Sequence, residues 1–403
     1  MTTTETGTAD AVAAYYDPYD VDINNDPYPA FKALRDEAPV YYNEPYDFWA
    51  LSRFDDIDRA LRDHDTFISG RGGILELIKA GIEMPPGILI FEDPPSHTYH
   101  RRLLSRVFTP KRVAELEPKV REYCVQCLDP FVGETEFDFI AHLGAQVPMK
   151  TISMLLGIPE SDQEFIRDRV DANIRTEAGQ PMEVSDDFVD ASIFADYIDW
   201  RADHPSDDLM TDLLNATFED ETGETRALRR DEILTYVNVI AGAGNETTNR
   251  LIGWSGKVLG EHPEQRRELV ADQSLIPNAI EELLRFEPPA PHVGRVVARE
   301  AEIDGVTVPE GSAILLLLGS GNRDERRWEH PDRFDIHRNV GQILSFGYGI
   351  HFCLGAALAR MEARVALEEL LTRFPDWEVD IDRCHLSPTS TVRGWETLPV
   401  RLG

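Results

Sequence analysis

The segment Phe346–Gly355, with the sequence FGYGIHFCLG, constrains the fold of this chain more than any other stretch. Its glycines, Gly349 and Gly355 among them, predict a tight turn, because glycine permits close approaches and backbone conformations that a side chain would block. The turn delivers one cysteine, Cys353, to the start of a helix predicted over Leu354–Phe374. Helix N–H groups and the helix dipole favour a thiolate there. We therefore expect a readily ionised thiol with a chemical role; the alternative is a small, inert, buried cysteine.

Helical patterns dominate the rest of the sequence, and shorter runs typical of strands lie between them. The predicted helices are Tyr28–Glu37, Phe54–Asp63, Lys111–Phe131, Val184–Asp203, Arg229–Leu259 and Pro277–Phe286, and the predicted strands are Val40–Asn43, Phe48–Ser52, Arg295–Ala298 and Ala313–Leu318. Asp93-Pro94-Pro95 predicts a further helix start, with Asp93 as the N-cap. The Gly-rich region His64–Ile90 predicts a mobile loop of the kind that often covers an active site. The sequence contains no internal repeat and no long linker, so we expect one domain over residues 1–403, with residues 1–20 as a flexible N-terminus.

The charge balance excludes several kinds of partner. The 403 residues include 73 acidic and 40 basic side chains, a formal net charge of −33, which argues against nucleic acid and anionic membranes. Four cysteines are too few for a disulfide-built secreted protein, and Cys124 and Cys127 lack a second pair at zinc spacing, so we expect core or partly exposed thiols. The N-terminus has no signal-peptide layout, and the longest apolar run, Ala313–Leu318, is too short to span a membrane. We therefore expect a cytoplasmic protein.

Two other patterns have a spacing suited to chemistry. Glu282 and Arg285 lie three residues apart, so they share one face of a helix, although alone such a pair is usually a surface ion pair. The segment AGNETT, residues 243–248, places a glycine and two threonines inside the longest predicted helix, where they lower helix propensity. That segment is either a polar interruption with a function or a softened core helix.

The segment around Cys353 resembles the haem-binding signature of the cytochrome P450 family, and most of the chain follows that resemblance. The positions that match are Phe346, Gly349, His351, Cys353 and Gly355. The resemblance implies a mostly α-helical prism with a smaller β-rich side, and a haem b cofactor with Cys353 as the axial iron ligand. Thiolate donation into the iron favours cleavage of the O–O bond over simple O₂ storage.

The resemblance also implies roles for residues elsewhere in the chain. Glu282 and Arg285 form a buried pair that supports the cysteine loop, with Arg333 as its third partner. Two haem propionates need cations or hydrogen-bond donors. The matching residues are His97, Arg101, Arg295 and His351.

The AGNETT segment matches the part of the family's long helix that handles oxygen. Gly244 is expected to leave room for O₂, Thr247 to hydrogen-bond it and Glu246 to relay protons from solvent, because two protons must reach the distal oxygen before water can leave. By the same analogy, substrate lies over the distal haem face between the segments 69–90, 165–197, 290–293 and 390–394 and the long helix. The expected pocket residues are Ile90, Val239, Ile240, Ala243, Ala290 and Val293, mostly apolar or small.

The resemblance predicts an O₂-dependent monooxygenase that hydroxylates a small, mainly apolar molecule: a steroid, terpenoid, fatty acid, polyketide or aromatic compound. Electrons would come from a separate acidic ferredoxin and its NAD(P)H-dependent reductase. The expected docking residues are Arg102, Arg106, Lys111, Arg112, Arg360 and Arg364, unless these are merely scattered solvated cations. The alternatives are a peroxide-using peroxygenase, which often lacks the acid or the alcohol over the iron, and a haem-based sensor or binding protein.

Overall fold

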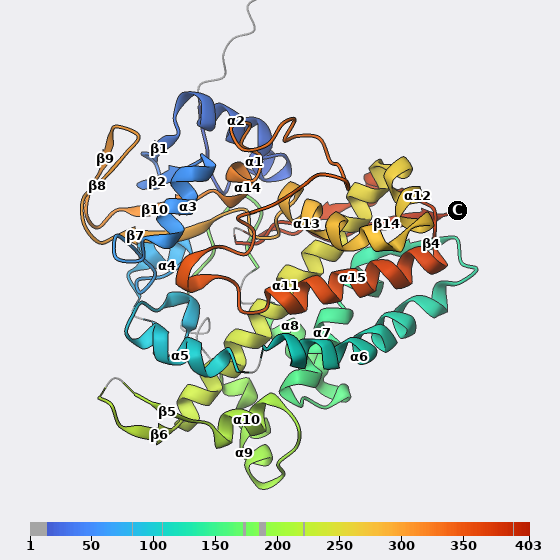
Figure 1. Cartoon of the computed structure of the whole chain (residues 1–403), viewed down its shortest axis with the longest axis horizontal. Helices are drawn as coiled ribbons and strands as arrows, with labels where there is room; N and C mark the ends of the chain where they lie inside the picture. The colour runs from blue at the N-terminus through green and yellow to red at the C-terminus, as the bar shows by residue number, and fades with distance from the viewer. Residues whose placement is uncertain are drawn as a thin grey trace, which may run out of the picture.

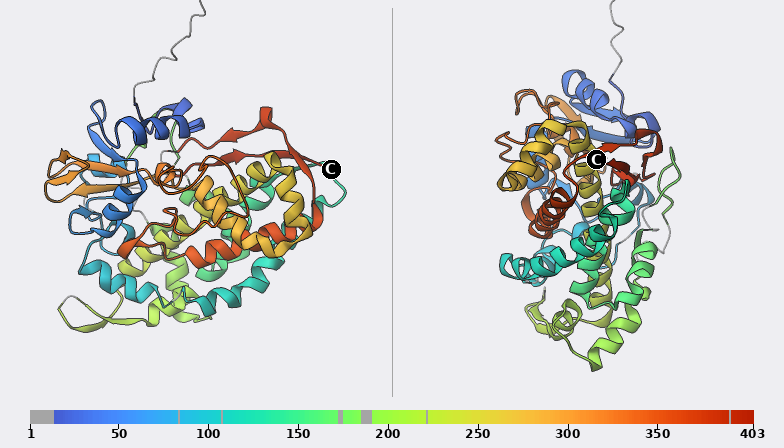
Figure 2. Two further views of the ribbon diagram at one scale, coloured as in Figure 1. Left: turned by 45° about the horizontal axis from the view of Figure 1, so that its top comes forward. Right: turned by 90° about the vertical axis from the view of Figure 1, so that its right-hand side faces the viewer.

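The computed structural model describes residues 14–82, 84–106, 108–171, 175–184, 191–220, 222–389 and 391–403. Figure 1 shows a large helical part on one side of the molecule and a smaller part, in which the main sheet lies beside the N-terminal helices, on the other. Figure 2 (left) shows the same division, with the orange hairpin of β8 (Ala301–Ile303) and β9 (Val306–Val308) at one end and the C-terminus at the other. The expected mainly α fold with a smaller β-rich region is confirmed.

The helices of the described chain vary greatly in length. They are α1 (Val21–Asn25), α2 (Tyr28–Glu37), α3 (Phe54–Arg62), α4 (Leu75–Ala80), α5 (Ser96–Leu104), α6 (Pro110–Leu128), α7 (Val147–Leu156), α8 (Gln163–Asp171), α9 (Ala195–Asp203), α10 (Leu209–Asn215), α11 (Arg230–Glu261), α12 (Pro263–Ala271), α13 (Ile276–Phe286), α14 (Leu318–Gly321) and α15 (Ala356–Arg373). Short turns matter at two places: the 3₁₀ turn Leu89–Phe91 before α5, and the 3₁₀ turn Gly349–His351 before α15.

The strands form one larger sheet and several small ones. The remaining strands are β1 (Val40–Asn43), β2 (Phe48–Leu51), β3 (Phe67–Ile68), β4 (Glu136–Asp138), β5 (Thr217–Glu219), β6 (Thr225–Ala227), β7 (Val293–Val297), β10 (Ala313–Leu316), β11 (Trp377–Val379), β12 (His385–Leu386), β13 (Trp395–Thr397) and β14 (Pro399–Leu402). The five-stranded sheet has the order β1-β2-β10-β7-β3. Its strand β10 runs parallel to β2 and antiparallel to β7, which places Ile314 opposite both Trp49 and Arg295. Arg295 is therefore held inside the sheet.

Hydrophobic periodicity located most long elements correctly. The helix predicted over Tyr28–Glu37 matches α2, and the expected long helix matches α11 within two residues at each end. The helix expected over Val184–Asp203 is wrong at its start: Val184 is not helical, residues 185–190 lie outside the described chain, and α9 begins at Ala195. Helices α7, α8, α10 and α12 were missed.

The centre of the helical part is α11. It packs against α7, α8, α13 and α15, and α15 in turn packs along α6. Its first turn is closed by the Glu232 carboxylate, which accepts the Arg229 N–H at 2.7 Å. The residues of α11 from Asn249 to Gly256 are all buried, whereas Ala243 is exposed and Thr247 half-buried. One face of the middle of α11 therefore remains available for a ligand.

Two local expectations need correction. Residues 1–13 of the expected flexible N-terminus lie outside the described chain, but Tyr16 is buried and its carbonyl accepts the Asn43 side-chain N–H at 2.9 Å, so that part is packed. Asp93 does not cap α5. Its carboxylate instead accepts the N–H groups of Ser69 at 2.9 Å and Gly70 at 2.7 Å.

A buried acid on α15 leads to a prediction about stability. Burial raises the pKa of Glu362 from 4.5 to about 8, and its Oε2 has no hydrogen-bond partner among the described residues. The unfolded chain then loses this proton at lower pH than the folded chain, so the free energy of unfolding should fall as pH rises from about 4.5 to about 8. We expect Glu362→Gln to flatten this fall and to raise the melting temperature by about 4 °C at pH 8 but hardly at pH 5. Thermal unfolding of the wild type and the variant at both pH values checks this prediction. An equal change in melting temperature at the two pH values would contradict it.

Candidate active site

The Cys353 loop is held in place by its own backbone and by α3. The Cys353 N–H donates to the Phe346 carbonyl at 2.8 Å, which closes the turn. Gly349 has a φ of 69°, and a Cβ there would lie 2.7 Å from the backbone oxygen of Leu61 at the end of α3. A side chain at Gly349 would therefore collide with main chain that cannot move aside. By contrast, a Cβ at Gly355 would meet no described atom within 4 Å.

The sulfur of Cys353 lies in a mixed environment. Cys353 retains accessible surface, yet it is crowded by protein atoms, and this desolvation raises the pKa of its thiol. A hydrogen bond from the Gly355 N–H, together with Arg101 and Arg360, lowers the same pKa but does not outweigh desolvation. The expected readily ionised thiol is thus not found for the protein alone. Binding to a metal ion would remove the proton outright.

The aromatic ring next to the cysteine is covered by a cation. The Arg360 guanidinium lies 4.3 Å from the ring centroid of Phe346 and pairs with Glu281 at 2.5 and 2.9 Å. This arrangement holds the Phe346 ring at the start of the Cys353 loop.

The four residues expected to bind propionates come together from three elements. His97 and Arg101 lie on α5, Arg295 on β7, and His351 in the turn before Cys353. The rings of His97 and His351 have centroids 4.6 Å apart, and Arg101 Nη2 donates to the Phe352 carbonyl at 2.7 Å. Arg295 is buried, and its burial lowers its pKa to about 10 despite the nearby carboxylate of Asp93.

The two imidazoles of this cluster are neutral at ordinary pH. Burial, reinforced by Arg101, lowers the pKa of His97 to about 4. Burial, reinforced by Arg295 and His97, lowers the pKa of His351 to about 2. Their Nε2 atoms are buried without a hydrogen-bond partner in the described chain. Such unpaired buried groups, next to two arginines and one thiol, suit a prosthetic group that carries carboxylates and a metal ion.

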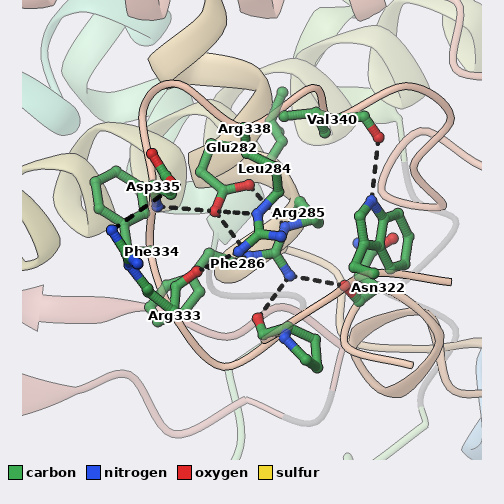
Figure 3. Close-up of polar contacts among 12 residues, drawn as sticks. Glu282, Leu284, Arg285, Phe286, Asn322, Arg333, Phe334, Asp335, Arg338 and Val340 are labelled. Atoms are coloured by element: carbon green, nitrogen blue, oxygen red, sulfur yellow. Dashed lines mark hydrogen bonds and ion pairs between the residues drawn. The ribbon is translucent and has the colours of Figure 1, made fainter. Parts of the chain in front are cut away.

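The predicted Glu282–Arg285 pair is present and fully buried, with both side chains 0% exposed (Figure 3). Arg285 donates to Glu282 at 2.7 and 2.8 Å, and its other N–H groups donate to the carbonyls of Asn322 at 3.0 Å and Pro331 at 2.8 Å. The pair thus ties α13 to two distant loops at once.

The third partner of the pair is not the residue expected. The Arg333 side chain is 71% exposed, and only its backbone carbonyl accepts from Arg285, at 3.4 Å. Arg338 instead donates from Nε to Glu282 Oε1 at 3.1 Å (Figure 3). Its guanidinium also donates to the carbonyls of His330 and Arg333. The assignment of Arg333 is corrected to Arg338, because the chain turns back after Asp335 and brings the later arginine to the carboxylate.

Asn322 connects this scaffold to the cysteine loop, and sequence reasoning missed it. Its carbonyl accepts from Arg285, its Oδ1 accepts the Leu344 N–H at 2.7 Å, and its Nδ2 donates to Ser345 Oγ at 2.8 Å. Leu344 and Ser345 directly precede Phe346, whose carbonyl holds Cys353. No local pattern marks Asn322, since its partners lie more than twenty residues away.

The acid and the alcohol of AGNETT have different surroundings. The Thr247 hydroxyl is half-buried and donates to the Ala243 carbonyl at 2.9 Å, on the face of α11 that also carries Val239. Glu246 is buried and forms an ion pair with Arg250, which also donates to the Trp395 carbonyl. Glu246 thus lies at the junction of α11 and the C-terminal strands.

The interpretation of Gly244 as space for O₂ needs correction. A Cβ at Gly244 would lie 2.5 Å from Cδ1 of Ile152 on α7. The missing side chain therefore permits α11 and α7 to approach each other.

The segments expected to surround the substrate are linked to one another. Gly294 donates to the Gly73 carbonyl at 2.7 Å, Arg393 donates from its backbone N–H to the Pro289 carbonyl at 2.7 Å, and Thr176 donates to the Pro388 carbonyl at 2.9 Å. Of the expected pocket residues, Ile240 is buried, Val239, Ala290 and Val293 are half-buried, and Ala243 and Ile90 are exposed. Parts of these segments, residues 83, 172–174, 185–190 and 390, lie outside the described chain.

Comparison with known proteins identifies the family. A family model described as cytochrome P450 matches residues 165–393. The chain is 39% identical over 391 residues to cytochrome P450 123 of Mycobacterium tuberculosis, an alignment that covers 95% of this chain and 96% of the relative. The chain belongs to the cytochrome P450 family. Members of this family are haem-dependent monooxygenases that act on a substrate and O₂, so the cofactor that the buried imidazoles and Cys353 suit is a haem.

Solved P450 structures share the whole fold. The structure of CYP109Q5 from Chondromyces apiculatus superposes with a TM-score of 0.85 at 35% identity and covers 97% of this chain and 99% of that one. The structure of CYP109E1 from Bacillus megaterium in complex with testosterone has a TM-score of 0.84 at 27% identity, with 95% of this chain and 100% of that one covered. In the described part of this chain, no helix has the length and apolar character needed to cross a membrane.

Proposed function

We propose that this P450 uses haem b to hydroxylate a small, mainly apolar molecule, with electrons from a separate ferredoxin and its NAD(P)H-dependent reductase. The observation that carries the proposal is the accessible face of α11, where the Thr247 hydroxyl donates to the Ala243 carbonyl and Val239 lies about two turns before Thr247. This face offers one polar group in small or apolar surroundings, which favours an apolar substrate such as a steroid, terpenoid, fatty acid, polyketide or aromatic compound. The testosterone complex of CYP109E1 supports this range. We further propose that the chain works as one domain in the cytoplasm.

The proposed haem contacts follow from the groups that lack partners. Cys353 would be the axial iron ligand, with Phe346 beside it and the Gly355 N–H donating to its sulfur. His97, Arg101, Arg295 and His351 would bind the propionates. When bound, haem supplies the iron at which O₂ is activated, and the thiolate ligand favours O–O cleavage.

The proposed catalytic residues, Glu246 and Thr247 of α11, would hold and move protons. Glu246 would take protons from solvent at its carboxylate and pass them to the Thr247 hydroxyl, which would donate toward the bound O₂. The ion pair with Arg250 keeps the Glu246 carboxylate oriented at the C-terminal strands until a proton arrives. A chain that retains both the acid and the alcohol favours use of O₂ and external electrons over direct use of peroxide.

The experiment that tests this function compares oxidants with a substrate library. Binding of each compound is read from the change in haem absorbance, and turnover is then measured with ferredoxin, reductase and NADPH or with hydrogen peroxide alone. We expect an apolar compound to bind and to be hydroxylated in the electron-dependent reaction. Turnover with peroxide alone would indicate a peroxygenase, and binding without a product in either reaction would indicate a sensor.

Thr247→Ala is expected to separate electron use from product formation. Without the hydroxyl, protons are delivered poorly, so product per NADPH consumed should fall about tenfold or more while peroxide is released. Thr248→Ala is the matched control, because the neighbouring threonine is buried away from the accessible face. Unchanged coupling in Thr247→Ala would show that its role in proton delivery is wrong or redundant.

The ion pairs among the described residues support a narrower set of proposed docking residues for the ferredoxin. Arg112, Arg360 and Arg364 are each paired with a carboxylate, at 2.5 Å in the shortest contact. Arg102 and Arg106 are exposed, and no ion pair is found for either within the described residues. They lie at the end of α5, next to Arg101, whose guanidinium contacts the loop of Cys353.

We expect Arg106→Glu to lower the ferredoxin-dependent reduction rate about tenfold at low salt and to weaken the salt dependence of that rate. Arg112→Glu serves as the comparison and should have a smaller effect. Stopped-flow measurements at several ionic strengths give the reduction rates of both variants. Equal rates for the wild type and Arg106→Glu would show that ferredoxin does not dock at this surface.

A further inference from the structure

The loop between β3 and α5 is tied down at both ends by two consecutive carboxylates. Asp93 accepts the N–H groups of Ser69 and Gly70, where the loop begins, at 2.9 and 2.7 Å. Glu92 accepts the Gly87 N–H, near the end of the loop, at 2.6 Å. The loop was predicted to be mobile, yet both of its ends are fixed to the residues that precede α5.

The Glu92 carboxylate is itself held by a histidine. Nδ1 of His100, on α5, lies 2.8 Å from Glu92 Oε1 and 2.7 Å from Oε2. Glu92 is 7% exposed and His100 6% exposed. The buried Glu92 carboxylate thus contacts the His100 imidazole and accepts one backbone N–H. Loss of either donor would leave a buried carboxylate oxygen without a partner, which costs a large desolvation free energy.

The loop and His100 both pack against α11 near the Glu92–His100 pair. Gly87 has a φ of 104°, and a Cβ there would lie 3.3 Å from Cγ2 of Thr235 and 3.6 Å from the ring of Tyr236. The His100 ring packs edge-on against the Tyr236 ring, with centroids 5.7 Å apart. Glycine at position 87 thus permits the turn that brings the loop onto α11 just before Val239.

The segment that Glu92 fixes is apolar on its inner side. Ile88 and Phe91 form a buried cluster with Leu77 and Met182, and Val239 of α11 packs against that cluster. Met182 also donates its N–H to Glu76 Oε1 at 3.1 Å, which joins a second pocket segment to α4. This cluster lies beside the accessible face of α11 on which the proposed function depends.

We propose that Glu92 and His100 are positioning residues for the substrate pocket: they hold the Gly87–Phe91 segment against α5 and α11 and so limit the size and the entry rate of the molecules that reach that face. The proposal rests on the proposed function, because it requires that substrate bind at this face. Neither residue touches the reacting atoms. Their effect comes from the position of the apolar segment between them.

The test measures binding of 4-phenylimidazole and of imidazole to the haem-loaded protein by stopped-flow absorbance. We expect His100→Ala and Glu92→Ala to raise both the association and the dissociation rate of 4-phenylimidazole on the order of tenfold, the scale of one lost hydrogen bond to a charged group. Rates for the smaller imidazole should change by less than about twofold, since it needs no displacement of the segment. A general loss of stability would alter both ligands alike.

One conservative variant and one control variant at a second His–Glu pair complete the design. In His100→Asn the side-chain amide can replace Nδ1 as donor, so this variant should restore wild-type rates. His337→Ala removes an exposed histidine that pairs with Glu268 at the same 2.7 Å, and should change nothing. Hydrogen exchange of the 84–91 segment in the holoenzyme gives an independent measurement, and Glu92→Ala should speed it.

The outcomes are distinct. If 4-phenylimidazole rates and 84–91 exchange remain at wild-type values in both alanine variants, the proposal is overturned. If the wild-type holoenzyme gives no azole difference spectrum, the proposed function fails, and this inference fails with it. If both azoles respond equally and His100→Asn does not restore the rates, the pair has a structural role only and the proposal is wrong.

Discussion

Arg285→Lys is expected to destabilise the folded protein by about 3–5 kcal/mol, although it preserves the charge. The guanidinium donates to both oxygens of Glu282 and to the carbonyls of Asn322 and Pro331, all in a fully buried site. A lysine ammonium cannot reach these diverging acceptors together, so buried carbonyls would lose their donors. Because Asn322 also positions Leu344 and Ser345, haem content should fall with stability. Urea unfolding and haem content per protein measure both effects.

Arg333→Ala provides the control for this prediction. The Arg333 side chain is 71% exposed, and its backbone carbonyl survives the substitution, so the change in unfolding free energy should stay within about 0.5 kcal/mol. Arg338→Ala removes a direct donor to Glu282 and should fall between the two. If Arg333→Ala were as damaging as Arg285→Lys, the assignment of Arg338 as the third partner would be wrong.

Cys353→Ala is expected to abolish the thiolate-type carbon monoxide difference spectrum of the reduced protein. Among the described cysteines, Cys353 is the one that lies between His351 and the start of α15 in the chain, next to the His97–His351 ring contact. The backbone bond from residue 353 to the Phe346 carbonyl is retained in the alanine variant, so the fold should persist. The loss should therefore appear in the spectrum and in monooxygenase turnover, with little change in the circular dichroism of the helices.

The remaining cysteines supply controls of the same type. Cys384 is half-buried and its Sγ lies 3.2 Å from the Asp380 carbonyl, and Cys127 is half-buried on α6. Cys384→Ala and Cys127→Ala should both retain the thiolate-type spectrum. A thiolate-type spectrum in Cys353→Ala would place the axial ligand elsewhere and would refute the proposed haem contacts.

Features that depend on neighbours in the chain could be predicted from the sequence. The helix over Tyr28–Glu37 and the pairing of Glu282 with Arg285 follow from helical spacing, since residues three and four apart meet on one face. The burial of that pair was expected only from the resemblance to the cytochrome P450 family. The resemblance that begins at Cys353 extended these patterns to His97, Arg101 and Arg295, which the structure brings together from α5 and β7. Their roles as ligands of haem stay predictions.

The features that could not be predicted involve partners remote in sequence. Nothing near Gly244 indicates that Ile152 fills the space beside it, and nothing near Asp93 indicates that its carboxylate accepts from Ser69 and Gly70. The direction of the pKa shift of Cys353 also could not be predicted, because it depends on residues remote in sequence. Its helix position favours a thiolate, but desolvation by surrounding segments outweighs that effect.

The sequence by itself determined the spacing of the scaffold pair, which depends on local helix geometry. It also determined the cysteine and, through the resemblance of its contiguous motif to the cytochrome P450 signature, the reaction class. Only the tertiary structure decided that Arg338 completes the scaffold, that Asn322 carries it to the cysteine loop, and that Glu92 and His100 hold the loop over α11. The physical reason is distance. A hydrogen bond needs its two atoms within about 3 Å, and for residues far apart in sequence only the packed fold sets that separation.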